Sequence, residues 1–167
     1  MPLETQTYDL EETLESKREA LEEIAETVAG LEPDNPAYKG QMREGNAIES
    51  HIEGLAWALK NWEVEEVTLG AMTGGEVAQM ENELAKDGTG PGDGRIATIV
   101  HGTIDAPYLR DEQAKTYYHV GQLQYGLQKW LETEIEDLTS GNANSGPTFG
   151  DLLEAKRHEQ DGTDDSK

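Results

Sequence analysis

The residues best able to carry chemistry in this sequence are its histidines and the glycines near residue 90. Two histidines that bind one metal ion from one helix face usually stand four residues apart. The histidines here instead lie in four separate segments, as His51, His101, His119 and His158. We therefore predict that they are surface or partly buried residues and that the chain has no histidine metal site.

The glycine-rich stretch 88–94 resembles a phosphate-binding loop only superficially. A P-loop ends in Gly-Lys-Ser/Thr, and a dinucleotide-binding loop needs the order Gly-x-Gly-x-x-Gly. No Lys follows these glycines, and Asp93 stands where the third dinucleotide glycine belongs. Asp87, Thr89 and Asp93 offer oxygen ligands, but the EF-hand pattern is absent, so only a weak cation site stays open. We predict a linker here and no cofactor.

Other catalytic patterns are also missing from the sequence. The chain has no cysteine, which excludes disulfides, thiolate metal sites and cysteine nucleophiles. No serine has the Gly-x-Ser-x-Gly context of a hydrolase nucleophile. With 35 Asp and Glu residues, many carboxylates lie close together by chance, so such pairs do not indicate acid–base catalysis. We predict that the protein is not an enzyme, with an unrecognised type of enzyme as the alternative.

Aromatic and apolar side chains give the better functional lead. Several Tyr and Trp residues occur in the span 111–138, and these residue types are enriched at interface hot spots. A second apolar group follows residue 148 and could dock into a groove on a partner. Ordinary core packing is the alternative interpretation. The predicted partner-binding residues are Tyr117, Tyr118, Tyr125, Trp130, Phe149, Leu152 and Leu153.

These residues must be positioned by a fold that we predict to be mainly α. The first part, residues 9–62, predicts an antiparallel helical hairpin, because two segments with helical periodicity are joined by a short link. Residues 9–31 repeat apolar positions at alternating spacings of four and three, with Lys17 at one of them. The resulting helix seam, which could also serve oligomerisation, is formed by Leu10, Leu14, Leu21, Ile24, Val28 and Leu31.

The second predicted helix, over residues 36–62, contains three glycines. Gly40, Gly45 and Gly54 each disfavour a helix by about 1 kcal/mol relative to Ala. We expect the close approach of a facing helix to compensate for this cost.

Residues 63–140 predict a small, mostly helical domain with at most one or two short strands. A short apolar segment near 64–70 suits a strand, and a capped helix follows from Thr73 to about Lys86. Residues 95–106 fit a helix better, although their β-branched side chains leave a strand open.

The rest of the chain predicts one long helix and an appendage. Helical periodicity continues from 111 to 138 without a clear interruption. Residues 141–167 predict a Gly/Asn/Ser linker, a short amphipathic helix and an acidic tail.

The charge of the chain bears on where it works. Its 35 acidic and 13 basic residues give a formal net charge of -22, spread along the chain. Such self-repulsion loosens a compact state unless concentrated salt screens it, which favours a protein of an extreme halophile or its virus over an acidic mesophilic protein. The same field repels phosphates and anionic lipids, so we predict no nucleic-acid or membrane partner. We find no bilayer-length apolar run or basic leader and predict a cytoplasmic protein.

The order of segments within 63–140 resembles that of the tail assembly chaperones of tailed viruses. The matching segments are a short apolar stretch, a second apolar block, an Ile-Asp-Ala-Pro-Tyr ending, and a helix of the form Val-x-x-Leu-x-x-x-Leu-x-x-Trp-Leu, at 67–73, 96–100, 104–108 and 120–131. The resemblance implies a small helical protein without enzymatic activity. It also implies that the protein coats a tape-measure protein during tail assembly and hands over to tail-tube subunits.

Our leading hypothesis is therefore a viral assembly protein that binds a tape-measure or tube protein in high salt, in the host cytoplasm, as a homo-oligomer. One alternative is a permanent virion component, such as a head–tail connector, a tail protein or a capsid accessory protein. Another is a cellular coiled-coil adaptor unrelated to viruses.

Salt dependence tests whether the acidic surface needs concentrated salt. We expect the helical circular dichroism signal to fall on dialysis from about 3 M to about 0.1 M salt, because the Debye length grows from below ~3 Å to about 10 Å. An unchanged spectrum across that range would show that the protein folds equally well without the screening.

Overall fold

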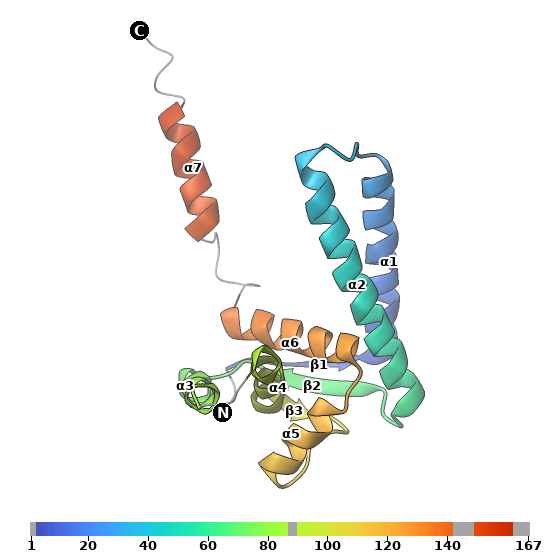
Figure 1. Cartoon of the computed structure of the whole chain (residues 1–167), viewed down its shortest axis with the longest axis vertical. Coiled ribbons are helices and arrows are strands. Elements are labelled where there is room, and N and C mark those ends of the chain that lie inside the picture. The colour runs from blue at the N-terminus through green and yellow to red at the C-terminus, as the bar shows by residue number, and fades with distance from the viewer. Residues whose placement is uncertain (1–2, 87–89, 142–148, 162–167) are drawn as a thin grey trace.

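The fold combines seven helices with one small antiparallel sheet (Figure 1) within the part of the chain that the structure describes. The structure is a computed structural model that describes residues 3–86, 90–141 and 149–161. The predicted mainly α class is confirmed, but there are three strands where at most two were predicted. The elements are β1 (Thr5–Asp9), α1 (Leu10–Ala29), α2 (Pro36–Asn61), β2 (Glu66–Gly70), α3 (Gly74–Leu84), α4 (Pro91–Gly102), β3 (Thr103–Asp105), α5 (Gln113–Gly121), α6 (Tyr125–Ser140) and α7 (Phe149–Asp161).

The strand that was not predicted is β1, which pairs antiparallel with the central strand β2 in the order β1-β2-β3. Its residues are mostly polar and exposed, so it carries no apolar pattern of its own. Tyr8 lies opposite Val67 in the pairing and donates a hydrogen bond to Glu134 on α6 at 3.1 Å. The strand therefore exists because of partners about sixty and more residues away, which local sequence patterns do not reveal.

Residues 95–106 contain both of the structures that the sequence left open. The helix α4 runs to Gly102, and the strand β3 follows at once. Thr103 stands at the change, where its hydroxyl donates to the Ile99 carbonyl at 2.6 Å and lies 2.7 Å from the Tyr108 hydroxyl. The favoured helix is thus confirmed for most of the segment, and the strand for its end.

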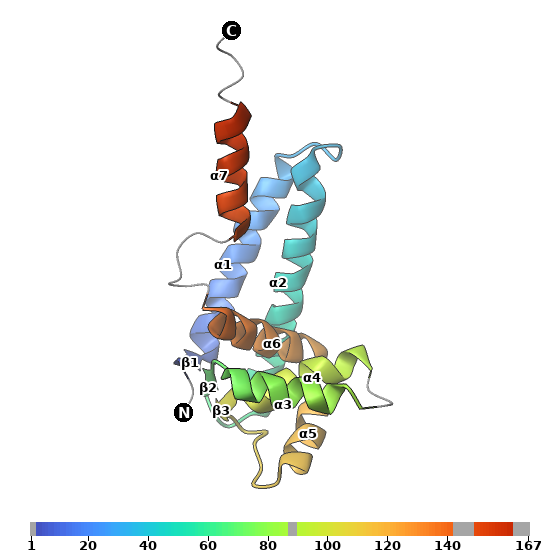
Figure 2. The same cartoon turned by 90° about the vertical axis from the view of Figure 1, so that its left-hand side faces the viewer.

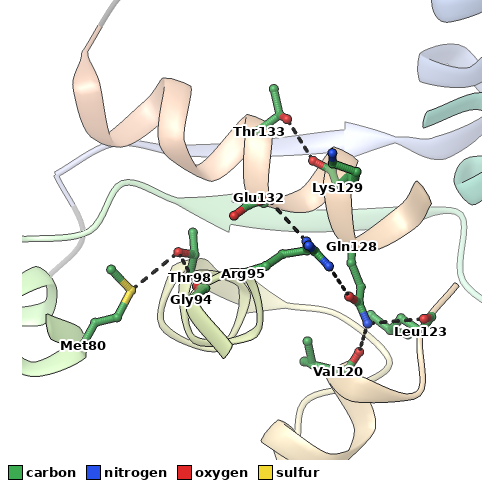
Figure 3. Close-up of polar contacts among 10 residues, drawn as sticks. All are labelled: Met80, Gly94, Arg95, Thr98, Val120, Leu123, Gln128, Lys129, Glu132 and Thr133. Atoms are coloured by element: carbon green, nitrogen blue, oxygen red, sulfur yellow. Dashed lines mark hydrogen bonds and ion pairs between the residues drawn. The ribbon is translucent and has the colours of Figure 1, made fainter. Parts of the chain in front are cut away.

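The single helix predicted over 111–138 is wrong, because α5 ends at Gly121 and α6 begins at Tyr125. The Gln124 side chain accepts a hydrogen bond from the Leu127 amide at 3.0 Å and so caps the new helix. Gln128 donates to the carbonyls of Val120 and Leu123 at the break, as Figure 3 shows. Side-chain hydrogen bonds thus satisfy backbone groups that a continuous helix would have paired.

Helices α1 and α2 lie side by side and project away from the sheet (Figures 1 and 2). Asp9 caps α1 by accepting from the Glu12 amide at 2.8 Å. Asn35 caps α2 by accepting from the Ala37 amide at 2.9 Å, and Pro36 occupies the first helical position. Both helix starts agree with the expected boundaries to within one residue.

The end of α2 that is nearer the sheet crosses α6 with almost no space between the two backbones. A Cβ atom placed on Gly54 would lie 2.0 Å from the Leu127 amide nitrogen, and one on Gly126 would lie 1.9 Å from the Ser50 carbonyl oxygen. Gly54 thus has the close neighbour that the sequence predicted, although the facing helix is α6 rather than α1. Gly45 does face α1, at Ile24, whereas nothing lies within 4 Å of a Cβ on Gly40, so the expectation fails there.

The main core fills the space among α2, α6, α4 and the sheet. Its largest fully buried side chain is Trp130, and Leu10 and Leu14 at the start of α1 belong to the same cluster. β1, α1 and α2 therefore contact elements of the predicted second domain, and the domain division stays a prediction. Of the predicted linkers and tail, residues 87–89, 142–148 and 162–167 lie outside the described residues.

The α2–α6 crossing predicts opposite effects for two substitutions on one helix. Gly54→Ala should lower the free energy of unfolding by about 3 kcal/mol, because its methyl group meets backbone atoms that cannot yield locally. Gly40→Ala should raise it by up to about 1 kcal/mol, because an exposed helical glycine is replaced by a better helix former. Urea unfolding in high salt measures both, and equal effects would contradict the crossing.

Candidate protein-binding surface

The halves of α1 and α2 that lie farther from the sheet form an apolar groove between them. Its walls are formed by Leu21, Ile24 and Val28 of α1 and by Met42 and Gly45 of α2, and its volume is about 360 Å³. Gly45 brings the helices close, since a Cβ there would lie 3.3 Å from the Ile24 side chain. The groove is thus a property of the two helices alone and needs no third element to form it.

The predicted helix seam is divided between the core and this groove. Leu10 and Leu14 are buried, whereas Leu21, Ile24, Val28 and Leu31 are only half-buried. Across from them, Met42 is 40% exposed. Two helices cannot cover their whole apolar stripes with each other, so the uncovered side of the seam faces solvent.

The lining of the groove is almost entirely apolar or neutral. Among the residues that the structure describes, its charged lining residue is Glu49 of α2, and none of the seven glutamates of α1 lines it. An apolar channel with one carboxylate favours an apolar ligand with a neutral or basic flank.

The four aromatic residues predicted to cluster on one helix lie on two. Tyr117 and Tyr118 belong to α5, and Tyr125 and Trp130 belong to α6. Trp130 is completely buried, with its ring 5.5 Å from that of Tyr8 in a T-shaped pair. It therefore packs the core and presents no surface to a partner.

Tyr125 is exposed and lies beneath two cations. The Arg95 guanidinium is 4.7 Å from the ring centre, and the Lys129 ammonium is 5.5 Å from it. Arg95 also contacts Gln128 at 3.4 Å and Glu132 at 3.5 Å, as Figure 3 shows. This arrangement joins α4 to α6 and uses Arg95 internally.

Tyr117 belongs to a polar cluster that joins α3, α4 and α5. Its hydroxyl donates to the Glu83 carboxylate at 2.7 Å, and His101 lies 3.3 Å from the same oxygen atom. The Tyr117 hydrogen bond lowers the pKa of Glu83, while burial and this carboxylate raise the pKa of Tyr117. The carboxylate is thus held charged and the phenol neutral, so each satisfies the other.

A hollow of about 460 Å³ lies beside this cluster, between Glu83, Ile96, Tyr117 and the exposed ring of Tyr118. The His101 side chain is 7% exposed and its Nε2 atom is engaged with Glu83. We interpret the cluster as a connection between helices. Sequence reasoning missed it because its three residues come from three separate segments.

The last predicted residues are on α7. Phe149 is 80% exposed, and Leu152 and Leu153 are also exposed. Every side chain described on this helix, from residue 149 to 158, faces solvent. The structure thus brings none of these three residues together with the tyrosines of α5 and α6.

The histidines are not brought together either. His51 is buried on α2, where burial, with Lys17 and Lys129 nearby, lowers its pKa to about 4. Across residues 3–86, 90–141 and 149–161, no group of three or more His, Asp or Glu side chains is placed to hold a metal ion. Asp87 and Thr89 of the weak cation pattern lie outside these residues, and Asp93 accepts a hydrogen bond from the Gly90 amide.

No described helix combines the length and apolar character needed to cross a bilayer. Comparison with known proteins gives no further guide: the chain matches no family model, no curated protein and no solved structure.

The polar cluster predicts different effects for two adjacent tyrosines. Tyr117→Phe should lower the free energy of unfolding at pH 7 by about 1 kcal/mol, because Glu83 loses its donor. The deficit should shrink as the pH falls through the folded-state pKa of Glu83, since the stability contributed by a carboxylate with a lowered pKa is present above the unfolded-state value and lost on protonation.

Tyr118→Phe is the matched control, because Tyr118 is 66% exposed and its hydroxyl should contribute little. Urea unfolding of both variants at pH 7 and pH 4 makes the comparison. Equal deficits, or a Tyr117→Phe deficit that does not change with pH, would contradict the role given to the cluster.

Proposed function

We propose that this protein is a non-enzymatic assembly protein that binds an amphipathic helix of a partner in the groove between α1 and α2. The observation that carries the proposal is the uncovered apolar stripe on the far half of these helices. Leu21, Ile24 and Val28 line the groove, and Met42 faces them, 40% exposed. An incoming helix would bury this stripe and complete a three-helix layer.

The dimensions and charge of the groove specify the partner's chemistry. The lining residues 21–28 span about two helical turns, which suits apolar anchors at positions i, i+3, i+4 and i+7 of a bound helix. Glu49 of α2 is the charged residue that lines the groove, so the partner helix should carry neutral or basic residues beside its anchors. Nucleic acid and membrane surfaces do not fit a chain with a net charge of -22.

In its more specific form, the proposal is an assembly chaperone of a tailed virus that works in concentrated salt in its host's cytoplasm. The α1–α2 pair would act as an antiparallel hairpin arm that holds a helical segment of the tape-measure or tube protein. The support is the resemblance of segments within 63–140, the net charge of -22 and the apolar arm. A homo-oligomer would have to leave the groove accessible to that partner.

Two exposed apolar residues allow a matched test. Met42 in the groove and Val64 outside it are 40% and 43% exposed, so replacing each with Glu adds the same charge at similar exposure. We expect Met42→Glu to abolish retention of one long helical protein from a high-salt extract of the virus-infected host. Val64→Glu should retain it, and both variants should keep the native circular dichroism spectrum.

Mass spectrometry of the retained proteins and of purified particles separates the alternatives. Absence of the chain from mature particles would support an assembly chaperone, whereas its presence there would make it a structural component. Retention of cellular proteins alone would contradict a viral role. Equal retention by the Met42 and Val64 variants would overturn the groove as the binding site.

A further inference from the structure

The chain itself contains a helix whose apolar face suits the groove. In α7, Phe149, Leu152 and Leu153 stand at positions i, i+3 and i+4, and all are exposed. Lys156 follows at i+7, where its aliphatic stem extends the stripe and its ammonium can reach the edge of an apolar surface. The opposite face carries Asp151, Glu154 and His158, so the helix is amphipathic and its apolar face is uncovered.

The lengths of the two apolar surfaces agree. The stripe from Phe149 to Lys156 spans about two helical turns, as does the α1 wall from Leu21 to Val28. The large Phe149 side chain is 80% exposed, and Met42 on the α2 wall of the groove is 40% exposed. Seating α7 there would cover both exposed apolar surfaces at once.

Charge adds one contact to the same pairing. Lys156 and Arg157 are adjacent on α7, and Glu49 is the charged residue that lines the groove. A basic side chain of α7 placed beside Glu49 would help to orient the helix in the groove.

The connection is long enough for α7 to reach the groove of its own chain. Residues 141–148 join Ser140 to Phe149, and a fully extended chain of that length spans about 30 Å. α6 meets α2 at Gly126 and Ser50, close to the start of α6, and runs away from α2 for about 21 Å from Gly126 to its end (Figure 1). Gly45 lies about 8 Å farther along α2. Figures 1 and 2 show α7 and the α1–α2 pair on the same side of α6.

We propose that α7 is an internal ligand of the α1–α2 groove and competes there with the partner helix. This inference rests on the proposed function, since it concerns regulation of the same groove. The undocked position of α7 then corresponds to the state in which the groove is open to a partner. If α7 occupied the groove nine-tenths of the time, the partner's apparent affinity would be about tenfold lower than its intrinsic affinity.

The lack of native cysteine permits a direct test in the full chain. A nitroxide attached through Ala155→Cys lies on α7, outside the apolar stripe. In high salt, we expect it to broaden the amide signals of residues 21–29 and 42–49 in the isotope-labelled protein. Adding Leu153→Asp should abolish the broadening, whereas His158→Asp, which adds the same charge on the opposite face of α7, should leave it unchanged.

A mixed sample shows whether the broadening arises within one molecule or between two. It contains isotope-labelled chains without the nitroxide and unlabelled chains that carry the nitroxide. Broadening confined to the doubly labelled chain supports docking of α7 within one molecule. Broadening of equal size in the mixture would overturn this and identify a second copy as the occupant. Absence of broadening, or equal effects of Leu153→Asp and His158→Asp, would also overturn the proposal.

Failure of this inference differs from failure of the proposed function. If the nitroxide does not broaden the groove signals but Met42→Glu abolishes partner retention, the groove binds a partner and α7 does not regulate it. If the nitroxide broadens the groove signals but Met42→Glu leaves partner retention unaffected, the proposed function fails. Where both hold, Leu153→Asp should strengthen partner binding, by about tenfold at nine-tenths occupancy.

Discussion

The backbone contact between α2 and α6 is the constraint on which the rest of the structure depends. Gly54 and Gly126 let the two helices meet where Cβ atoms would lie about 2 Å from the facing backbone. This crossing sets α6 over the sheet and places Trp130 in the core. It also fixes the direction in which the far half of α2 leaves the body. A side chain at either glycine would separate the helices. It would disturb both the core around Trp130 and the direction in which α2 projects.

The parts of α1 and α2 that project from the sheet, here called the arm, are packed differently from the rest of the fold, here called the body. In the body, apolar residues of α1 and α2 are covered by α6 and the sheet, as the burial of Leu10 and Leu55 shows. In the arm, each helix has only the other to pack against, so Ile24 and its neighbours stay half-buried. Exposed apolar surface of this kind commonly marks an interaction site. The proposed partner helix and α7 are two ways of covering the same stripe.

Charge adds a second constraint to the body and the arm. A chain with 35 acidic residues and 13 basic ones uses some of its scarce cations to join elements. Arg95, for example, connects α4 with Gln128, Glu132 and the Tyr125 ring of α6. Glu83 is likewise engaged with Tyr117 and His101 rather than open to a substrate. Glu49 is the charged residue that lines the groove, where it favours partners with neutral or basic flanks.

The sequence by itself determined the helical class, the boundaries of α1 and α2, the position of β2 and the seam residues. These features follow from local periodicity and caps, which depend on residues only a few positions apart. Tertiary structure alone decided β1 and the Glu83 cluster, because their hydrogen-bond partners come from other segments. At the break between α5 and α6 the hydrogen bonds are local, but the new helix begins where Gly126 meets Ser50 of α2. It also decided which seam residues are covered. The spacing that makes Leu10 and Ile24 equivalent in sequence is local, whereas the third layer that buries one and leaves the other half-exposed is not.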